Sequence, residues 1–195
     1  MEYCPCGNLR RILKKSEKNR FSEDKARVYI SEIILAIAHM HEHNILYRDL
    51  KPDNVLINDD GHIKLTDFGL SKELDEDTLQ SRSTVGSHAY LAPEVLEERP
   101  HGKTIDWYQT GVLLYEMLNS IPPFITTDEN MIYENIKKAP LVLEYFLSAE
   151  VKDLLTKLLS KNPYSRLGAR EGVNEIKSHP WFNSIDWDDL YRKRI

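Results

Sequence analysis

The sequence predicts a mainly α-helical domain with small β-hairpins near its middle. Three observations favour this fold class. Apolar residues recur at helical spacing between residues 22 and 40, and they fill most of the helix circumference between residues 104 and 119. Two short strand-like runs flank the turn sequence Asp59-Asp60-Gly61. The 195 residues, 41% hydrophobic and 29% charged, have the ordinary composition of one globular domain.

Two helices are expected in the first part of the chain. Asn8 is placed to cap a short helix and Ser22 a long one, because both side chains accept backbone N–H groups at a helix start. The apolar positions are Leu9, Ile12 and Leu13 in the short helix and Ala26, Ile30, Ile33, Ile37 and Met40 in the long one. Each helix is therefore predicted to bury one face.

A hairpin is expected after Asn44, where the helical spacing ends. The runs Val55–Asn58 and His62–Thr66 are short and strand-like, and the turn between them contains Gly61. A polar loop precedes this hairpin.

The centre of the core is predicted at Thr104–Asn119, which is apolar on nearly all sides and is followed by Pro122-Pro123 as a helix stop. Further helices are expected at about Asp128–Lys138, Ser148–Ser160 and Glu171–Lys177.

Charge and cysteine content narrow the function classes. The 26 Lys and Arg against 31 Asp and Glu give a net charge of −5, so no global positive field favours nucleic acid. No apolar run approaches the ~20 residues of a membrane span. The N-terminus does not have the pattern of a signal peptide, and Cys4 and Cys6 are the only cysteines. We expect an intracellular, cytoplasmic protein without a membrane span.

Three polar motifs carry chemistry. The loop Tyr47–Asn54 contains R-D-L-K-P-x-N, Asp67-Phe68-Gly69 follows the hairpin, and Ala92-Pro93-Glu94 comes later. The first two motifs bring carboxylates, a lysine and an asparagine onto short loops, as needed to hold Mg²⁺ on nucleotide phosphates and to orient a hydroxyl. This set predicts phosphoryl transfer.

The order and spacing of these motifs resemble the signature set of eukaryotic-type protein kinases. The likeness runs from Met1 to the end of the chain and covers the large, mostly helical C-terminal lobe of that fold. Lys51-Pro52 is the serine/threonine form of the loop. Finer features resemble the AGC group: Tyr47, Asp106-Trp107, Arg166-Leu167-Gly168, His179-Pro180-Trp181-Phe182 and Ile185-Asp186-Trp187.

The resemblance implies roles for single residues. Asp49 would orient or accept the proton of the substrate hydroxyl, Lys51 would neutralise charge on the transferred phosphoryl group, and Asn54 with Asp67 would hold Mg²⁺. In isolation, Asp and Asn in such loops usually cap turns. For ATP, the resemblance implies hinge contacts from Glu2 and Tyr3 and a purine floor of Leu56 and Thr66, although Leu56 is equally explained as core.

Other implied roles are structural. Glu94 and Arg166 would form a buried ion pair. Asp106 would fix the backbone of the catalytic loop, or stabilise a helix start, or both.

Regulation and substrate choice are implied by the segment after Asp67. Ser83, with Thr84 as its rival, would carry an activating phosphate from this or an upstream kinase, and Arg48 and Lys72 would bind it. The residues Asp53, Glu116 and Ser87 would contact protein substrates, and the first two favour basic ones. Asn8 replaces a usual acidic residue, and Ser87-His88-Ala89-Tyr90 also departs from the group pattern.

The eight glycines contain no G-x-G-x-x-G, and no V-A-I-K-type lysine is found. We therefore expect residues 1–195 to be the hinge and C-terminal lobe, without the N-terminal lobe, of a serine/threonine kinase that is weakly active or inactive in isolation. The alternative is a non-catalytic, pseudokinase-like binding or scaffold module.

Overall fold

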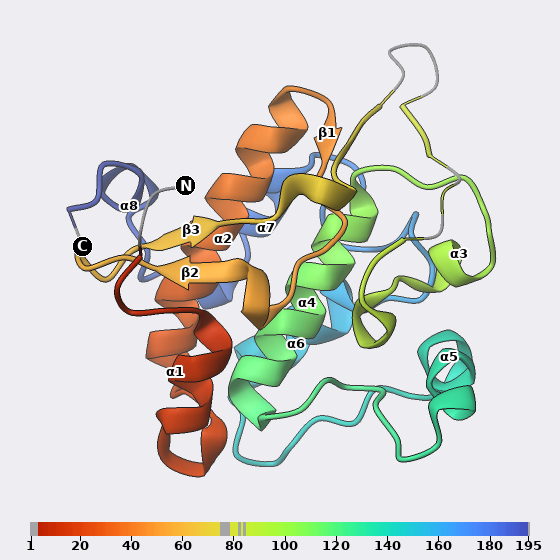
Figure 1. Cartoon of the computed structure of the whole chain (residues 1–195), viewed down its shortest axis with the longest axis horizontal. Helices are drawn as coiled ribbons and strands as arrows, with labels where there is room; N and C mark the ends of the chain where they lie inside the picture. Colours follow the sequence, from red (N-terminus) through yellow and green to blue (C-terminus); the bar gives the residue numbers. More distant parts are fainter. Residues whose placement is uncertain (1–3, 75–78, 82, 84, 195) are drawn as a thin grey trace.

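The computed structural model describes residues 4–74, 79–81, 83 and 85–194. Two helices, α2 (Glu23–Glu42) and α4 (Thr104–Asn119), pack against each other at its centre (Figure 1). Every residue of α4 from Ile105 to Leu118 is buried, as its all-round apolar pattern predicts. The mainly helical fold class is confirmed.

The two predicted N-caps are confirmed. Asn8 Oδ1 accepts the N–H of Arg11 at 3.0 Å, before α1 (Leu9–Lys15). Ser22 Oγ accepts the N–H of Lys25 at 3.4 Å, before α2. Each cap satisfies one of the backbone donors that a helix start leaves without an intrahelical partner.

Two small sheets hold the motif-bearing loops. Strands β2 (Val55–Ile57) and β3 (Ile63–Leu65) form the predicted hairpin, with Val55 opposite Leu65. Strands β1 (Ile45–Leu46) and β4 (Lys72–Glu73) pair antiparallel although the β2–β3 hairpin lies between them in the sequence. This pairing was not predicted from the sequence. The loop from β1 to β2 and the loop from β3 to β4 therefore start and end at paired strands, so the topology brings the two loops together.

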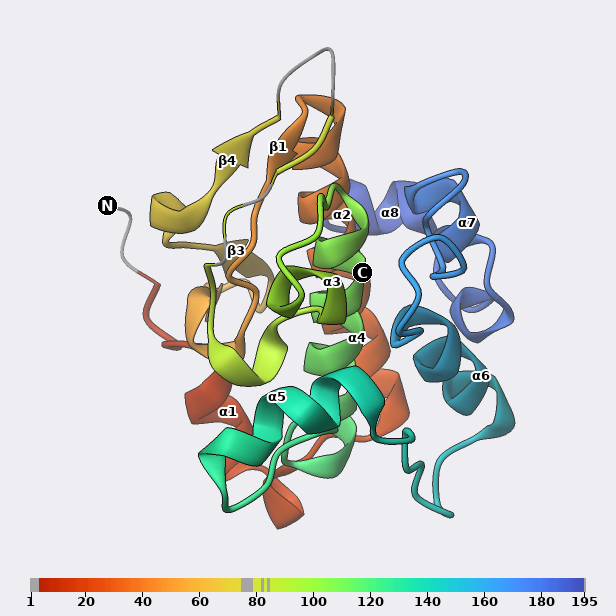
Figure 2. The same ribbon diagram turned by 90° about the vertical axis from the view of Figure 1, so that its right-hand side faces the viewer.

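The remaining helices surround the centre (Figure 2). Three of them were predicted and are observed with shorter bounds: α5 (Glu129–Lys138), α6 (Ala149–Leu158) and α7 (Val173–Lys177). Two were not predicted: α3 (Pro93–Leu96) and α8 (Trp187–Tyr191). Short 3-10 turns lie at η1 (Glu17–Asn19), η2 (Pro52–Asn54), η3 (Phe68–Leu70), η4 (His88–Tyr90) and η5 (Pro180–Phe182). Helix α4 ends before Pro122, because Ser120 takes a left-handed conformation with φ 70°.

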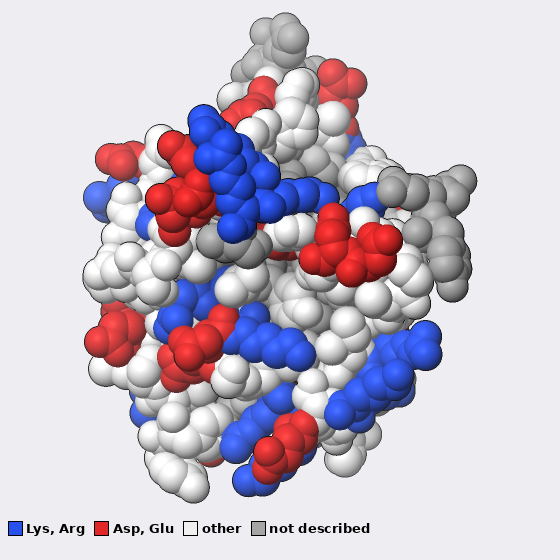
Figure 3. Space-filling view, turned by 90° about the vertical axis from the view of Figure 1, so that its left-hand side faces the viewer, with Lys and Arg blue, Asp and Glu red and all other residues white. Residues whose placement is uncertain are grey.

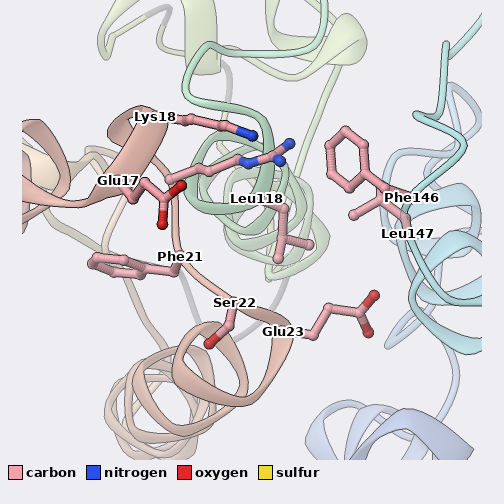
Figure 4. A pocket seen from close by; sticks show the side chains of 9 residues that line it. Glu17, Lys18, Phe21, Ser22, Glu23, Leu118, Phe146 and Leu147 are labelled. Carbon is pink, nitrogen blue, oxygen red and sulfur yellow. The ribbon is translucent and has the colours of Figure 1, made fainter.

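Charged side chains of both signs are intermixed on the face shown in Figure 3, in keeping with the modest net charge. Within the described residues, no helix combines the length and apolar character of a bilayer span. A pocket of about 320 Å³, bounded by the start of α2, the end of α4 and Phe146-Leu147, takes no side chain from the motif-bearing loops (Figure 4).

Candidate active site

The loop between β1 and β2 is anchored on the first turn of α4 by Asp106. Its carboxylate is fully buried and accepts the backbone N–H groups of Tyr47 (3.0 Å) and Arg48 (2.9 Å). Its Oδ2 also lies 2.8 Å from Nε2 of His41 in α2. These contacts hold Arg48 in a left-handed conformation (φ 69°), which costs a non-glycine residue of order 1 kcal/mol or more.

A second anchor, Gln109, was missed by sequence reasoning. Its Oε1 accepts the N–H of Leu50 (3.1 Å) and its Nε2 donates to the carbonyl of Arg48 (2.8 Å). Gln109 lies three residues after Asp106 and so faces the same side of α4. That spacing of two polar residues in an apolar helix is the signal in the sequence.

Three polar side chains meet around Asp49. Asp49 Oδ2 accepts hydrogen bonds from Lys51 Nζ (2.7 Å) and Asn54 Nδ2 (2.8 Å). Asp49 Oδ1 accepts the hydroxyl of Ser87 (3.0 Å), which also lies 3.0 Å from Lys51 Nζ. Asp49 and Asn54 are buried. A hydroxyl is thus held between a carboxylate and an ammonium group.

Tyr47 connects this loop to the one that carries Asp67. Its hydroxyl donates to the carbonyl of Thr66 (2.5 Å), and its ring meets Phe68 edge-on with 5.7 Å between centroids. Burial, and then the negative charges of Asp49 and Asp67, raise the pKa of Tyr47 well above its ordinary value. The hydroxyl therefore stays a neutral donor between the two loops.

The predicted metal ligands suit a hard cation. The amide nitrogen of Asn54 is bound to Asp49, which leaves its side-chain oxygen for other partners. The exposed carboxylate of Asp67 accepts one N–H, from Gly69 (3.3 Å). Carboxylate and amide oxygens are the donor types that Mg²⁺ takes alongside nucleotide phosphates, so this donor set fits the ion.

Of the predicted ATP contacts, Leu56 is half-buried on β2, where it pairs with Lys64 and bridges to Asn8. Thr66 directly follows β3 and donates its N–H to the carbonyl of Asn54 (3.0 Å). Glu2 and Tyr3 lie outside the described residues.

Around Ser83, the guanidinium of Arg48 donates to the Ser83 hydroxyl and, through Nε, to the carbonyl of Leu70 (2.6 Å). Lys72 contacts the hydroxyl of Ser81 (3.3 Å), which lies 3.1 Å from that of Ser83. Thr84 lies outside the described residues.

Glu94 and Arg166 form a buried pair, with N–O distances of 2.6 and 2.8 Å.

Two of the residues predicted to contact substrates are paired with an arginine of this chain. Asp53 and Glu116 both bind the guanidinium of Arg10, a residue that sequence reasoning did not select. The expectation of basic substrates depended on these two carboxylates. Ser87, the third residue predicted to contact substrates, lies with Asp49 and Lys51, as described above.

Comparison with known proteins agrees with this geometry. Residues 1–182 match the sequence profile of the family described as "Protein kinase domain". Serine/threonine-protein kinase Sgk2 of Rattus norvegicus is 46% identical over 195 residues, which are all of this chain and 53% of that protein. Ribosomal protein S6 kinase alpha-2 of Mus musculus is 46% identical over 181 residues, 92% of this chain and 25% of that protein. Protein kinase 2 of Dictyostelium discoideum is 44% identical over 178 residues, 91% of this chain and 37% of that protein. The chain therefore spans about half the length of these relatives, or less.

Proposed function

The chain belongs to the protein kinase family, and from this premise we propose that the intact protein transfers the γ-phosphoryl group of ATP to serine or threonine hydroxyls of proteins. One observation carries the proposal. The hydroxyl of Ser87 lies 3.0 Å from both Asp49 Oδ1 and Lys51 Nζ, which is where a substrate hydroxyl would need to be.

In the proposed step, the substrate oxygen forms a bond to the γ-phosphorus and the bond from that phosphorus to the β–γ bridging oxygen breaks, so ADP leaves. The proton of the hydroxyl passes to the carboxylate of Asp49. Lys51 offsets negative charge on the transferred group. Asn54 and Asp67 would hold Mg²⁺, which when bound neutralises phosphate charge.

Further roles follow from the same proposal. Leu56 and Thr66 would contact the adenine, together with the hinge residues Glu2 and Tyr3, and residues 1–195 would correspond to the hinge and C-terminal lobe of the kinase fold. Asp53 and Glu116 form a guanidinium site beside the catalytic loop, the type of site that binds basic substrates when it is free.

Regulation is proposed at Ser83. A phosphate there, added by this or an upstream kinase, would contact Arg48 directly. Lys72 contacts the hydroxyl of Ser81, which in turn lies beside the hydroxyl of Ser83. Because ATP is the donor and Cys4 and Cys6 are free thiols, we place the activity in the cytoplasm.

The test is Asp49→Asn, which keeps the size of the side chain and removes its ability to take the proton. We expect incorporation of labelled phosphate from ATP into a mixture of protein substrates to fall at least ~100-fold. The matched control is Asp59→Asn, in the exposed turn between β2 and β3, which should retain the parent rate. Thermal unfolding checks that both variants are folded.

Two outcomes would overturn the proposal. One is a parent protein that binds ATP and Mg²⁺ but transfers no phosphate, which favours the binding-module alternative. The other is transfer that survives Asp49→Asn unchanged.

A further inference from the structure

One guanidinium joins four elements that are far apart in the chain. Arg10 of α1 donates to Asp53 Oδ2 in η2 through Nε (3.2 Å) and Nη2 (3.0 Å). Its Nη1 donates to Glu116 Oε1 near the end of α4, and its Nη2 lies 3.4 Å from the hydroxyl of Tyr90 in η4.

Both carboxylate oxygens of Glu116, the buried acidic residue of this cluster, already accept a hydrogen bond. The side chain of Glu116 is 2% exposed, and while Oε1 binds Arg10, Oε2 accepts the hydroxyl of Tyr90. Burial, and then the charge of Glu116, raise the pKa of Tyr90, so it remains a donor. Although burial opposes it, Asp53 and Glu116 raise the pKa of Arg10 above its ordinary value.

Asp53 keeps more freedom, because its side chain is 46% exposed and Oδ1 has no hydrogen bond within the described part of the chain. An incoming guanidinium therefore has one free carboxylate oxygen to bind unless it displaces Arg10. The cluster of Arg10, Asp53 and Glu116 also carries one net negative charge instead of two.

The cluster lies close in sequence to the residues of the proposed acceptor position. Asp53 precedes Asn54, which binds Asp49, and Tyr90 lies three residues after Ser87, whose hydroxyl marks the proposed acceptor position. The rest of α1 adds the exposed cations Arg11, Lys14 and Lys15 and no acidic residue. The surface beside the proposed acceptor position is therefore more positive than the carboxylates of Asp53 and Glu116 alone would make it.

We propose that Arg10 is an internal occupant of the guanidinium site formed by Asp53 and Glu116, and that it makes the protein indifferent to basic residues before the phosphorylated serine. This inference rests on the proposed function. Arg10 is thus a specificity-determining residue: it supplies from within the chain the arginine that these carboxylates would otherwise take from the substrate.

The experiment measures peptide binding, which does not require phosphoryl transfer. A fluorescent serine peptide with alanine before the serine is compared with peptides that carry one arginine at each of the five preceding positions in turn. Anisotropy titrations use the intact parent, Arg10→Ala and the matched control Arg11→Ala, whose side chain is exposed.

We expect the parent and Arg11→Ala to bind all peptides within ~3-fold of one another. For one or two of the five arginine positions, Arg10→Ala should bind the arginine peptide at least ~10-fold more tightly than the alanine peptide, because the carboxylates of Asp53 and Glu116 then have no guanidinium from within the chain. Phosphorylation rates of the same peptides should follow the same order.

A parent that already prefers one arginine peptide by ~10-fold overturns the inference without any variant. So does a folded Arg10→Ala protein that gains no preference. If Arg10→Ala does not fold, Arg10→Gln/Glu116→Gln removes the buried charge as well, and it should show no arginine preference; a preference of ~10-fold there contradicts the assigned site. If Arg10→Ala gains the expected preference for arginine peptides but the parent transfers no phosphate, this inference is supported and the proposed function fails.

Discussion

Arg166 binds both carboxylate oxygens of Glu94, although 72 residues separate them in the chain. Both side chains are almost completely buried, and the same guanidinium also donates to the carbonyls of Ser160 and Thr104. The pair thus connects α3, at the end of the segment that holds Ser83 and Ser87, to the loop after α6. It fixes the end of that segment to the helical core.

Removing one partner of this pair should destabilise the fold strongly. Arg166→Met strands the buried carboxylate of Glu94, and we expect the free energy of unfolding to fall by about 3–5 kcal/mol. Chemical denaturation measures the change. Lys138→Met is the control, since it breaks an exposed ion pair with Glu134 in which the lysine is 77% exposed, and it should leave the free energy of unfolding close to that of the parent. Equal losses in the two variants would contradict the assigned role of the buried pair.

Asp106 should be a positioning residue for the catalytic loop. Asp106→Asn keeps the shape but turns one acceptor oxygen into a donor that faces N–H groups of Tyr47 and Arg48 or the ring of His41. We expect the free energy of unfolding to fall by about 2–3 kcal/mol and phosphate transfer to fall with it. If Asp106→Asn has the stability and the transfer rate of the parent, the loop does not depend on this anchor.

The sequence predicted the parts of the fold that local chemistry determines. Helices with a side-chain cap and an apolar face, such as the one after Ser22, follow from spacing alone. The pairing of Ile45–Leu46 with Lys72–Glu73 does not, because two-residue strands have no pattern and their partner lies across a hairpin. That long-range pairing is what brings the two motif-bearing loops together.

The candidate site shows the same division. The motif residues Asp49, Lys51 and Asn54 were found because their spacing is specific, and the structure brings them into one hydrogen-bonded cluster. Arg10 was missed because it occurs in an ordinary run of basic residues on a short helix. Its partners come from distant elements, so only the folded chain shows that this arginine differs from its neighbour Arg11.

Tyr47 should couple the two loops through its hydroxyl. Tyr47→Phe removes the hydrogen bond to the carbonyl of Thr66, and we expect a loss of about 1 kcal/mol in the free energy of unfolding. Phosphate transfer should decrease more than stability suggests, because Asp67 and Asp49 lose a connection between their loops. Tyr164→Phe, at an 80% exposed position, is the control. Tyr47→Phe with parent-like transfer would show that the hydroxyl does not position either loop.

Lys161 should make stability depend on alkaline pH. Burial, and then the positive charge of Arg166, lower its pKa from 10.5 to about 8, although Nζ donates to the carbonyl of Ile136 (2.6 Å). In the unfolded chain the pKa returns to its ordinary value near 10.5. Between pH 8 and 10.5 the unfolded chain therefore binds more protons than the folded one, so the contribution of Lys161 to the free energy of unfolding rises with pH.

Lys161→Met isolates this contribution from the other groups that titrate in the same range. We expect the free energy of unfolding of the parent, minus that of Lys161→Met, to be constant below about pH 8 and to increase from there to pH 10.5. Urea denaturation at a series of pH values measures the difference. Lys138→Met serves again as the control for an exposed lysine. A difference that stays level or decreases across that range would mean that the folded chain does not favour the neutral amine of Lys161.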